Sequence, residues 1–130
     1  MISAQLMAAQ YVPGEVRDFI LKYIASVAQI EALLLIWSNP GEHWGVTEIA
    51  ARIYASETET AKALERLSAD GFVVCTNGAF RLNASAENID MIRRLQEVYA
   101  RHLIPVTDII HSLSSNAPAT AETFSLKKDR

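Results

Sequence analysis

Residues 46–71 read VTEIAARIYASETETAKALERLSADG, and this stretch decides the fold. Its first eight residues carry apolar side chains at helical spacing, and Thr47 is placed to cap that helix. After a tight connection, Ser56 occupies an N-cap position with Glu59 three residues later, the spacing of a capping box. Gly71 is placed to end the second helix. The stretch therefore predicts two short helices joined by a tight turn, a helix-turn-helix unit.

A hairpin is predicted directly after this unit. Residues 72–76 (FVVCT) and 79–83 (AFRLN) are two short apolar or β-branched runs joined by Asn77-Gly78. Both central residues of a two-residue hairpin turn need a positive φ, which Asn and Gly tolerate best. We expect a two-stranded hairpin that projects beside the helix-turn-helix as a wing.

Helical patterns flank this central part on both sides. From Val16 to Ser38 the apolar positions recur every three or four residues, which predicts one long helix. A second pattern runs from Asn88 to about Leu113, and Pro105 within it predicts a kink or a break near residue 104. The expected fold is mainly α (α+β), a winged helix-turn-helix with a two-stranded wing hairpin and long flanking N- and C-terminal helices.

The size and composition of the chain suit a single domain. It has 130 residues, of which 50% are hydrophobic. We expect an N-terminal arm over residues 1–15, the winged-helix domain with its C-terminal dimerisation helix over residues 16–113, and a flexible tail over residues 114–130. One cysteine cannot form an internal disulfide, and no apolar run is long enough to span a membrane, so a cytoplasmic protein is predicted.

The sequence favours no enzymatic chemistry. It contains no Ser-His-Asp order, no phosphate-binding glycine loop and no obvious pair of catalytic acids. The three histidines and Cys75 have no metal-ligand spacing, so we expect neither a metal nor a cofactor. Cys75 lies in a predicted strand without a basic neighbour, which predicts a buried, inert thiol. Trp37, Trp44 and Tyr99 suit core packing or, alternatively, the lining of an effector cavity, although no effector is indicated.

One segment resembles a known family. Residues 46–83, VTEIAARIYASETETAKALERLSADGFVVCTNGAFRLN, are similar to the winged-helix segment of small bacterial regulators of the MarR type. The matching motifs are TEIA at residues 47–50, LERL at residues 64–67 and GFV at residues 71–73. The resemblance implies a winged-helix fold and a dimeric transcription regulator whose terminal helices form the dimer.

The charges near the helix-turn-helix leave two functions open. A helix of this kind fits the DNA major groove, with the wing free to reach the adjacent backbone. The candidate DNA-binding residues are Ser56, Thr58, Lys62 and Arg66 on the second helix, Arg81 on the wing, and Thr47 at the phosphate edge. However, residues 46–71 carry a net charge of −2 and the whole chain carries −3. Since DNA-binding surfaces are usually basic, the alternative is a winged-helix module that binds a protein.

The final helical pattern has more apolar surface than one small core needs to cover. Such a surface is a liability on a monomer, so we expect a homodimer. The candidate dimerisation residues are Ile89, Ile92, Leu95, Tyr99, Leu103, Val106 and Ile110. The sequence thus predicts a cytoplasmic, homodimeric regulator that binds double-stranded DNA.

Overall fold

The computed structural model describes residues 12–116 of the chain. Most of the predicted arm and almost all of the predicted tail therefore lie outside the described residues. The chain divides into two compact units, one made of residues 26–97 and the other of the segments before and after them. Among residues 12–116 no individual helix is long and apolar enough to cross a membrane. Helices 14–23 and 27–38 reach the length and apolar composition of a membrane span only when they are taken together, as a bent pair.

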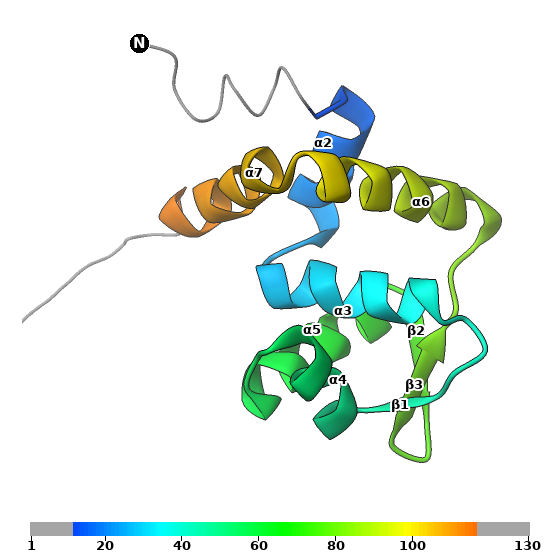
Figure 1. The fold of residues 1–130 in the computed structure, drawn as a ribbon. Coiled ribbons are helices and arrows are strands. Elements are labelled where there is room, and N and C mark those ends of the chain that lie inside the picture. Colours follow the sequence, from blue (N-terminus) through cyan, green and yellow to red (C-terminus); the bar gives the residue numbers. More distant parts are fainter. Residues whose placement is uncertain (1–11, 117–130) are drawn as a thin grey trace, which may run out of the picture. The chain divides into compact units, whose positions relative to one another are not determined.

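The unit of residues 26–97 is a winged helix (Figure 1). Its elements, in chain order, are α3 (Val27–Ser38), β1 (Trp44–Gly45), α4 (Val46–Ile53), α5 (Glu57–Ala69), β2 (Val73–Thr76), β3 (Ala79–Leu82) and most of α6 (Ala86–Arg101). Helix α3 packs against both α4 and α5, and α5 also packs against β2. The predicted helix-turn-helix and wing are confirmed. Helix α4 covers the first eight residues of the predicted unit, although Thr47 does not cap it, and α5 lies between the predicted cap Ser56 and Gly71.

The core of this unit forms where α3 crosses α5. Its central side chains come from α3, α4, α5 and the residue before β2, and all of them are fully buried: Ile30, Leu33, Ile36, Ile49, Leu64, Leu67 and Phe72. Burying one side chain of this size contributes about 1.5–3 kcal/mol before conformational entropy is counted. This core fixes which face of α5 points outward.

The turn between α4 and α5 is closed by the backbone. Tyr54 adopts a left-handed conformation with φ 58°, and its N–H and that of Ala55 both donate to the carbonyl of Ala50. Ser56 then caps α5 as predicted, because its Oγ accepts a hydrogen bond of 3.0 Å from the N–H of Glu59. The chain thereby passes from α4 to α5 through only three residues, 54–56.

The C-terminus of α5 is a Schellman motif. Gly71 has φ 85°, and its N–H donates to the carbonyl of Ser68 at 3.1 Å. The N–H of Phe72 donates to the carbonyl of Leu67 at 3.0 Å, and both of these side chains are fully buried. The motif ends the helix at the predicted residue and directs the chain into β2.

The wing has one strand more than predicted. Asn77 and Gly78 have φ of 54° and 79°, as the predicted tight hairpin turn requires. Strand β1, only two residues long, adds to the hairpin, so the sheet is three-stranded and antiparallel in the order β1-β3-β2. Two residues are too few to produce a strand pattern in the sequence, which is why β1 was not predicted.

The predicted single helix from Val16 to Ser38 is wrong. The structure has two helices instead, α2 (Gly14–Tyr23) and α3, with Ile24 in an extended conformation between them. Ser26 caps α3, because its Oγ accepts a hydrogen bond of 3.1 Å from the N–H of Gln29. The apolar spacing continues across the break, so periodicity alone did not reveal the cap.

The C-terminal pattern also forms two helices, as the proline predicted. Helix α6 ends at Arg101 and α7 (Leu103–Asn116) begins after His102, two residues before the expected position. Pro105 lies in the first turn of α7, where a missing N–H removes no helical hydrogen bond.

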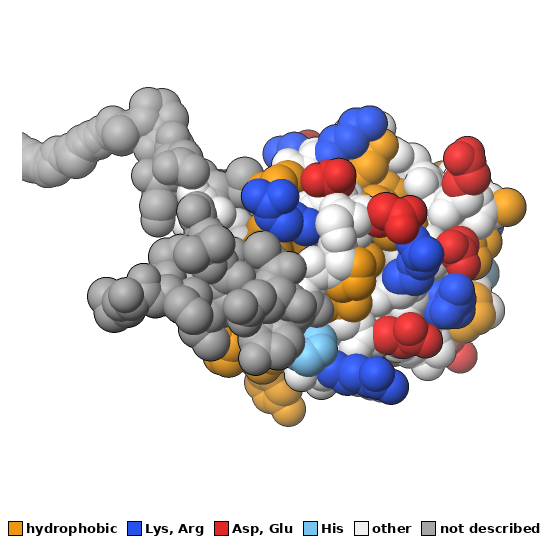
Figure 2. Space-filling model, turned by 90° about the horizontal axis from the view of Figure 1, so that it is seen from above, with side chains coloured by type: hydrophobic (Ala, Val, Ile, Leu, Met, Phe, Trp, Pro, Cys, Tyr) orange, Lys and Arg blue, Asp and Glu red, His pale blue; other side chains and the backbone are white. Residues whose placement is uncertain are grey.

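The face seen in Figure 2 carries interspersed basic and acidic side chains rather than a basic patch.

The second unit is built on α2 and α7, which pack against each other. Both helices contribute buried aliphatic or aromatic side chains to it: Val16, Phe19, Ile20, Val106, Ile109 and Ile110. These residues give the unit an apolar core of its own.

Replacing Gly71 by Ala is expected to lower the free energy of unfolding by about 1–2 kcal/mol, because a Cβ is strained in the left-handed region. Urea unfolding measures the change. Gly41 is the matched control, since its backbone is not left-handed and a Cβ there would meet no atom within 4 Å. An equal loss in Gly71→Ala and Gly41→Ala would contradict the role of the Schellman motif.

Candidate nucleic-acid interface

Helix α5 presents a polar face to solvent. Thr60, Ala63, Leu64 and Leu67 are buried on its inner side. Thr58, Lys62 and Arg66 are exposed, and Ser56 is exposed at the N-cap. These four side chains are accessible to a partner that approaches α5.

The charges on this face are mixed. Arg66 pairs with Asp70 one turn later at 3.9 Å, whereas Lys62 has no ion pair among residues 12–116. Glu57 and Glu59 are both exposed in the first turn, where carboxylates interact favourably with the helix dipole. Lys62 is therefore the cation of α5 that is most available to an anionic partner.

The start of α4 differs from the prediction at Thr47. The N-cap is Gly45, and Thr47 is the second residue of the helix, with an exposed side chain. The carboxylate of Glu48 accepts a hydrogen bond of 3.0 Å from the N–H of Gly45, which occupies one of the free donors at the helix start. Thr47 thus has no capping role, and its hydroxyl is exposed.

The wing carries Arg81 on the side opposite to α5. Phe80 and Cys75 form a cross-strand pair with their side chains toward α5, and side chains alternate along a strand. Arg81, the next residue after Phe80, is exposed on the other face of the sheet. Arg81 and the cations of α5 therefore do not form one continuous basic surface.

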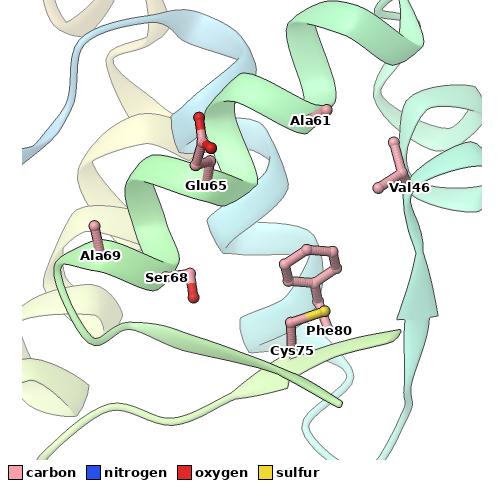
Figure 3. Close-up of a pocket in the computed structure, with 7 residues that line it drawn as sticks. All are labelled: Val46, Ala61, Glu65, Ser68, Ala69, Cys75 and Phe80. Atoms are coloured by element: carbon pink, nitrogen blue, oxygen red, sulfur yellow. The ribbon is translucent and has the colours of Figure 1, made fainter. Parts of the chain in front are cut away.

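A groove of about 520 Å³ separates α5 from the inner face of the wing (Figure 3). It is lined by Val46, Ala61, Glu65, Ser68, Ala69, Cys75 and Phe80. This lining is mostly apolar and has a carboxylate but no cation. A phosphate that passed between α5 and the wing would meet one hydroxyl and no opposite charge.

The prediction of a buried Cys75 is wrong. The thiol is exposed and lies in the groove, because the wing extends beyond the core and leaves the end of its inner face uncovered. The Cys75 side chain points toward α5 without being covered by it.

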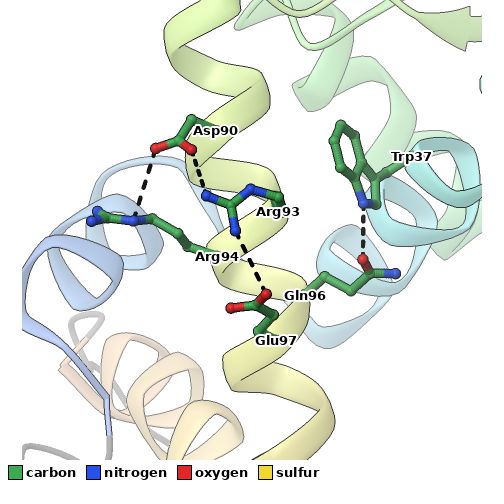
Figure 4. A network of polar contacts seen from close by, with 6 residues as sticks. All are labelled: Trp37, Asp90, Arg93, Arg94, Gln96 and Glu97. Carbon is green, nitrogen blue, oxygen red and sulfur yellow. Dashed lines mark hydrogen bonds and ion pairs between the residues drawn. The ribbon is translucent and has the colours of Figure 1, made fainter.

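Helix α6 carries its own ion-pair network, as shown in Figure 4. Arg93 contacts Asp90 at 2.7 Å and Glu97 at 3.5 Å, and Arg94 lies 3.8 Å from Asp90. The hydrogen bond from Arg93 lowers the pKa of Asp90 below its ordinary value. These two arginines are therefore paired with carboxylates of their own helix.

The aromatic residues have different environments. Trp44 is buried, with the guanidinium of Arg52 5.1 Å from its ring. The indole N–H of Trp37 donates to Oε1 of Gln96 at 3.0 Å (Figure 4). Nε2 of Gln96 also donates to Oγ of Ser38 at 3.1 Å. The pair of Trp37 and Gln96 joins α3 to α6 across 59 residues of sequence, so no local pattern indicated it.

The candidate dimerisation residues differ in exposure. Ile92, Leu95, Val106 and Ile110 are buried within the chain, and Tyr99 is half-buried. Ile89 is 38% exposed and Leu103 is 48% exposed. Ile104, which was not among the candidates, is 65% exposed beside Leu103.

No family model and no curated protein matches the chain. Its structure is similar to that of the transcriptional regulator Tm0710 from Thermotoga maritima, with 17% identity, 84% of this chain and 77% of that chain covered, and a TM-score of 0.48. It is also similar to a MarR family protein from Bacillus stearothermophilus, with 18% identity, coverage of 83% and 70%, and a TM-score of 0.44. A likeness at this level carries no argument about function, and the winged-helix assignment rests on the elements described above.

Cys75 is expected to react with a disulfide reagent such as DTNB in the folded protein, at one thiol per chain, because it is exposed in the groove. The absorbance of the released thiolate measures the reaction without denaturant. The variant Cys75→Ser provides the blank. A thiol that reacts only after unfolding would contradict the open groove.

Proposed function

We propose that this protein is a homodimeric transcription regulator that binds double-stranded DNA through α5. The observation that carries the proposal is the orientation of α5. Its apolar side is buried against α3, and its exposed side carries Thr58, Lys62 and Arg66 beside a wing. One α-helix fits the major groove of DNA, and a wing can follow the neighbouring backbone.

The six candidate residues fall into three pairs with different roles in this proposal. Lys62 and Arg66 contact phosphates or the acceptor edges of bases, and Ser56 and Thr58 donate hydroxyl hydrogen bonds. Thr47 and Arg81 contact phosphates on either side of the groove. Arg81 lies on the sheet face away from α5, so it would contact a different stretch of the DNA backbone from the residues of α5.

The homodimer is supported by exposed apolar side chains on α7. Leu103 and Ile104 are adjacent and both substantially exposed, and Leu21 on α2 is 37% exposed. Apolar side chains of this size are usually covered when they gather on a surface. A second copy of the chain is the proposed cover, with the protein acting in the cytoplasm and without a cofactor.

The affinity for DNA should depend on Lys62. In Lys62→Ala, binding at 50 mM salt is expected to weaken roughly three- to tenfold, and the slope of log affinity against log salt should fall by about 1. Fluorescence anisotropy on DNA from upstream of the protein's own gene, repeated across a salt series, measures both quantities. The variant Arg66→Ala should have a smaller effect, because Asp70 already neutralises part of that charge.

Arg93→Ala is the matched control, since Arg93 is paired twice within α6. Its affinity and salt slope should equal those of the wild type. Absence of any wild-type binding at low salt would refute DNA binding by this protein. Equal losses in Lys62→Ala and Arg93→Ala would place the contact away from α5.

The groove favours a second candidate function, binding of a protein partner. Its lining is apolar with one carboxylate and no cation, which suits a side chain better than a phosphate. This alternative predicts no DNA affinity at any salt concentration and a partner that co-purifies with the wild type. Ala69→Glu, which places a second carboxylate in the groove, should then release that partner.

The homodimer predicts a defined response to charge on α7. Replacing both Leu103 and Ile104 by Glu should convert the protein to a monomer, because two carboxylates would be buried without partners in the interface. Sedimentation velocity measures the mass. Ala51→Glu, an exposed site on α4, is the control and should leave the mass unchanged. A monomeric wild type would refute the dimer.

A further inference from the structure

The turn of the helix-turn-helix contains an unusual residue. Tyr54 is 95% exposed, and its backbone lies in the left-handed region at φ 58°. Gly is the residue that adopts this conformation without strain, and a bulky side chain there is uncommon. The position therefore places an aromatic ring in solvent on a backbone that disfavours any side chain.

No contact within the described part of the fold explains the presence of this ring. Within residues 12–116 the Tyr54 side chain takes part in no hydrogen bond and no ring contact. The turn closes through the N–H groups of Tyr54 and Ala55 on the carbonyl of Ala50, which any residue with an N–H could provide. Because the side chain makes no stabilising contact within these residues, a role in binding accounts for it better than a role in stability.

Its place in the chain indicates which partner it meets. Tyr54 stands two residues before Ser56, the cap of α5, and so at the end of α5 that enters a major groove first. The first turn of α5 carries Glu57 and Glu59, and its first cation is Lys62. The first turn of α5 thus offers a phosphate no cation, so a neutral donor beside it would add to binding, and tyrosine hydroxyls commonly fill that role.

We propose that the hydroxyl of Tyr54 donates a hydrogen bond to a DNA phosphate at the edge of the groove that receives α5. This inference rests on the proposed DNA-binding function and adds a residue and a type of contact to it. The contact is neutral, so it adds affinity without releasing a counterion. It also compensates for the carboxylates of the first turn, which repel phosphate.

Three single variants test the contact. Tyr54→Phe removes only the hydroxyl and should weaken DNA binding about three- to tenfold, with no change in the salt slope. Tyr54→Gly should lose at least as much affinity. Its melting temperature should stay within about 4 °C of the wild type, because relief of backbone strain offsets the greater freedom of Gly in the unfolded chain. Tyr23→Phe, in α2, is the matched control and should bind as the wild type does.

The outcomes separate this inference from the proposed function. If the wild type binds DNA and Tyr54→Phe binds equally well, the phosphate contact is wrong while DNA binding stands. If Tyr54→Phe is unchanged but Tyr54→Gly is weakened, the ring and not the hydroxyl makes the contact, which also overturns the proposal. A wild type that binds no DNA removes the basis of both. A selective loss in Tyr54→Phe at constant salt slope supports the hydrogen bond.

Discussion

The burial of one face of α5 against α3 is the interaction on which the rest of this structure depends. Leu64 and Leu67 are fully buried there, and successive residues of a helix are rotated by about 100°. Once these two side chains face inward, Thr58 and Lys62 must face outward. The cap at Ser56 and the Schellman motif at Gly71 then set where α5 begins and ends. Any partner of this surface therefore meets a helix that is already rigid and oriented.

The same constraint produces the unusual charge of the surface. Turning α5 outward also exposes Glu57, Glu59 and Glu65, while the cations remain dispersed. Arg66 is engaged by Asp70, and Arg81 lies on the sheet face away from α5. DNA binding here would rely less on a continuous basic surface than on a few cations assisted by hydroxyl groups. That balance is the physical reason why the proposed DNA partner and the alternative protein partner both fit this surface.

Local signals in the sequence predicted most of this unit, and non-local packing accounts for what was missed. Ser56, Gly71 and Asn77-Gly78 act through backbone geometry within a few residues, so each was predicted at its observed position. The break at Ser26 was missed because the apolar period continues through it. Strand β1 exists only by pairing with β3, where Trp44 lies opposite Phe80 and Gly45 opposite Ala79, far away in the sequence. Such contacts leave no periodic trace in the chain.

By itself, then, the sequence determined the helix-turn-helix and the hairpin that follows it, because capping and turn residues select backbone conformations locally. It also determined which residues of α5 share a face. Only the tertiary structure decided how much each candidate residue is exposed: the open thiol of Cys75, the burial of Ile92 and Leu95, and the solvated ring of Tyr54. Exposure depends on which elements pack over a position, and that depends on contacts between segments far apart in the chain.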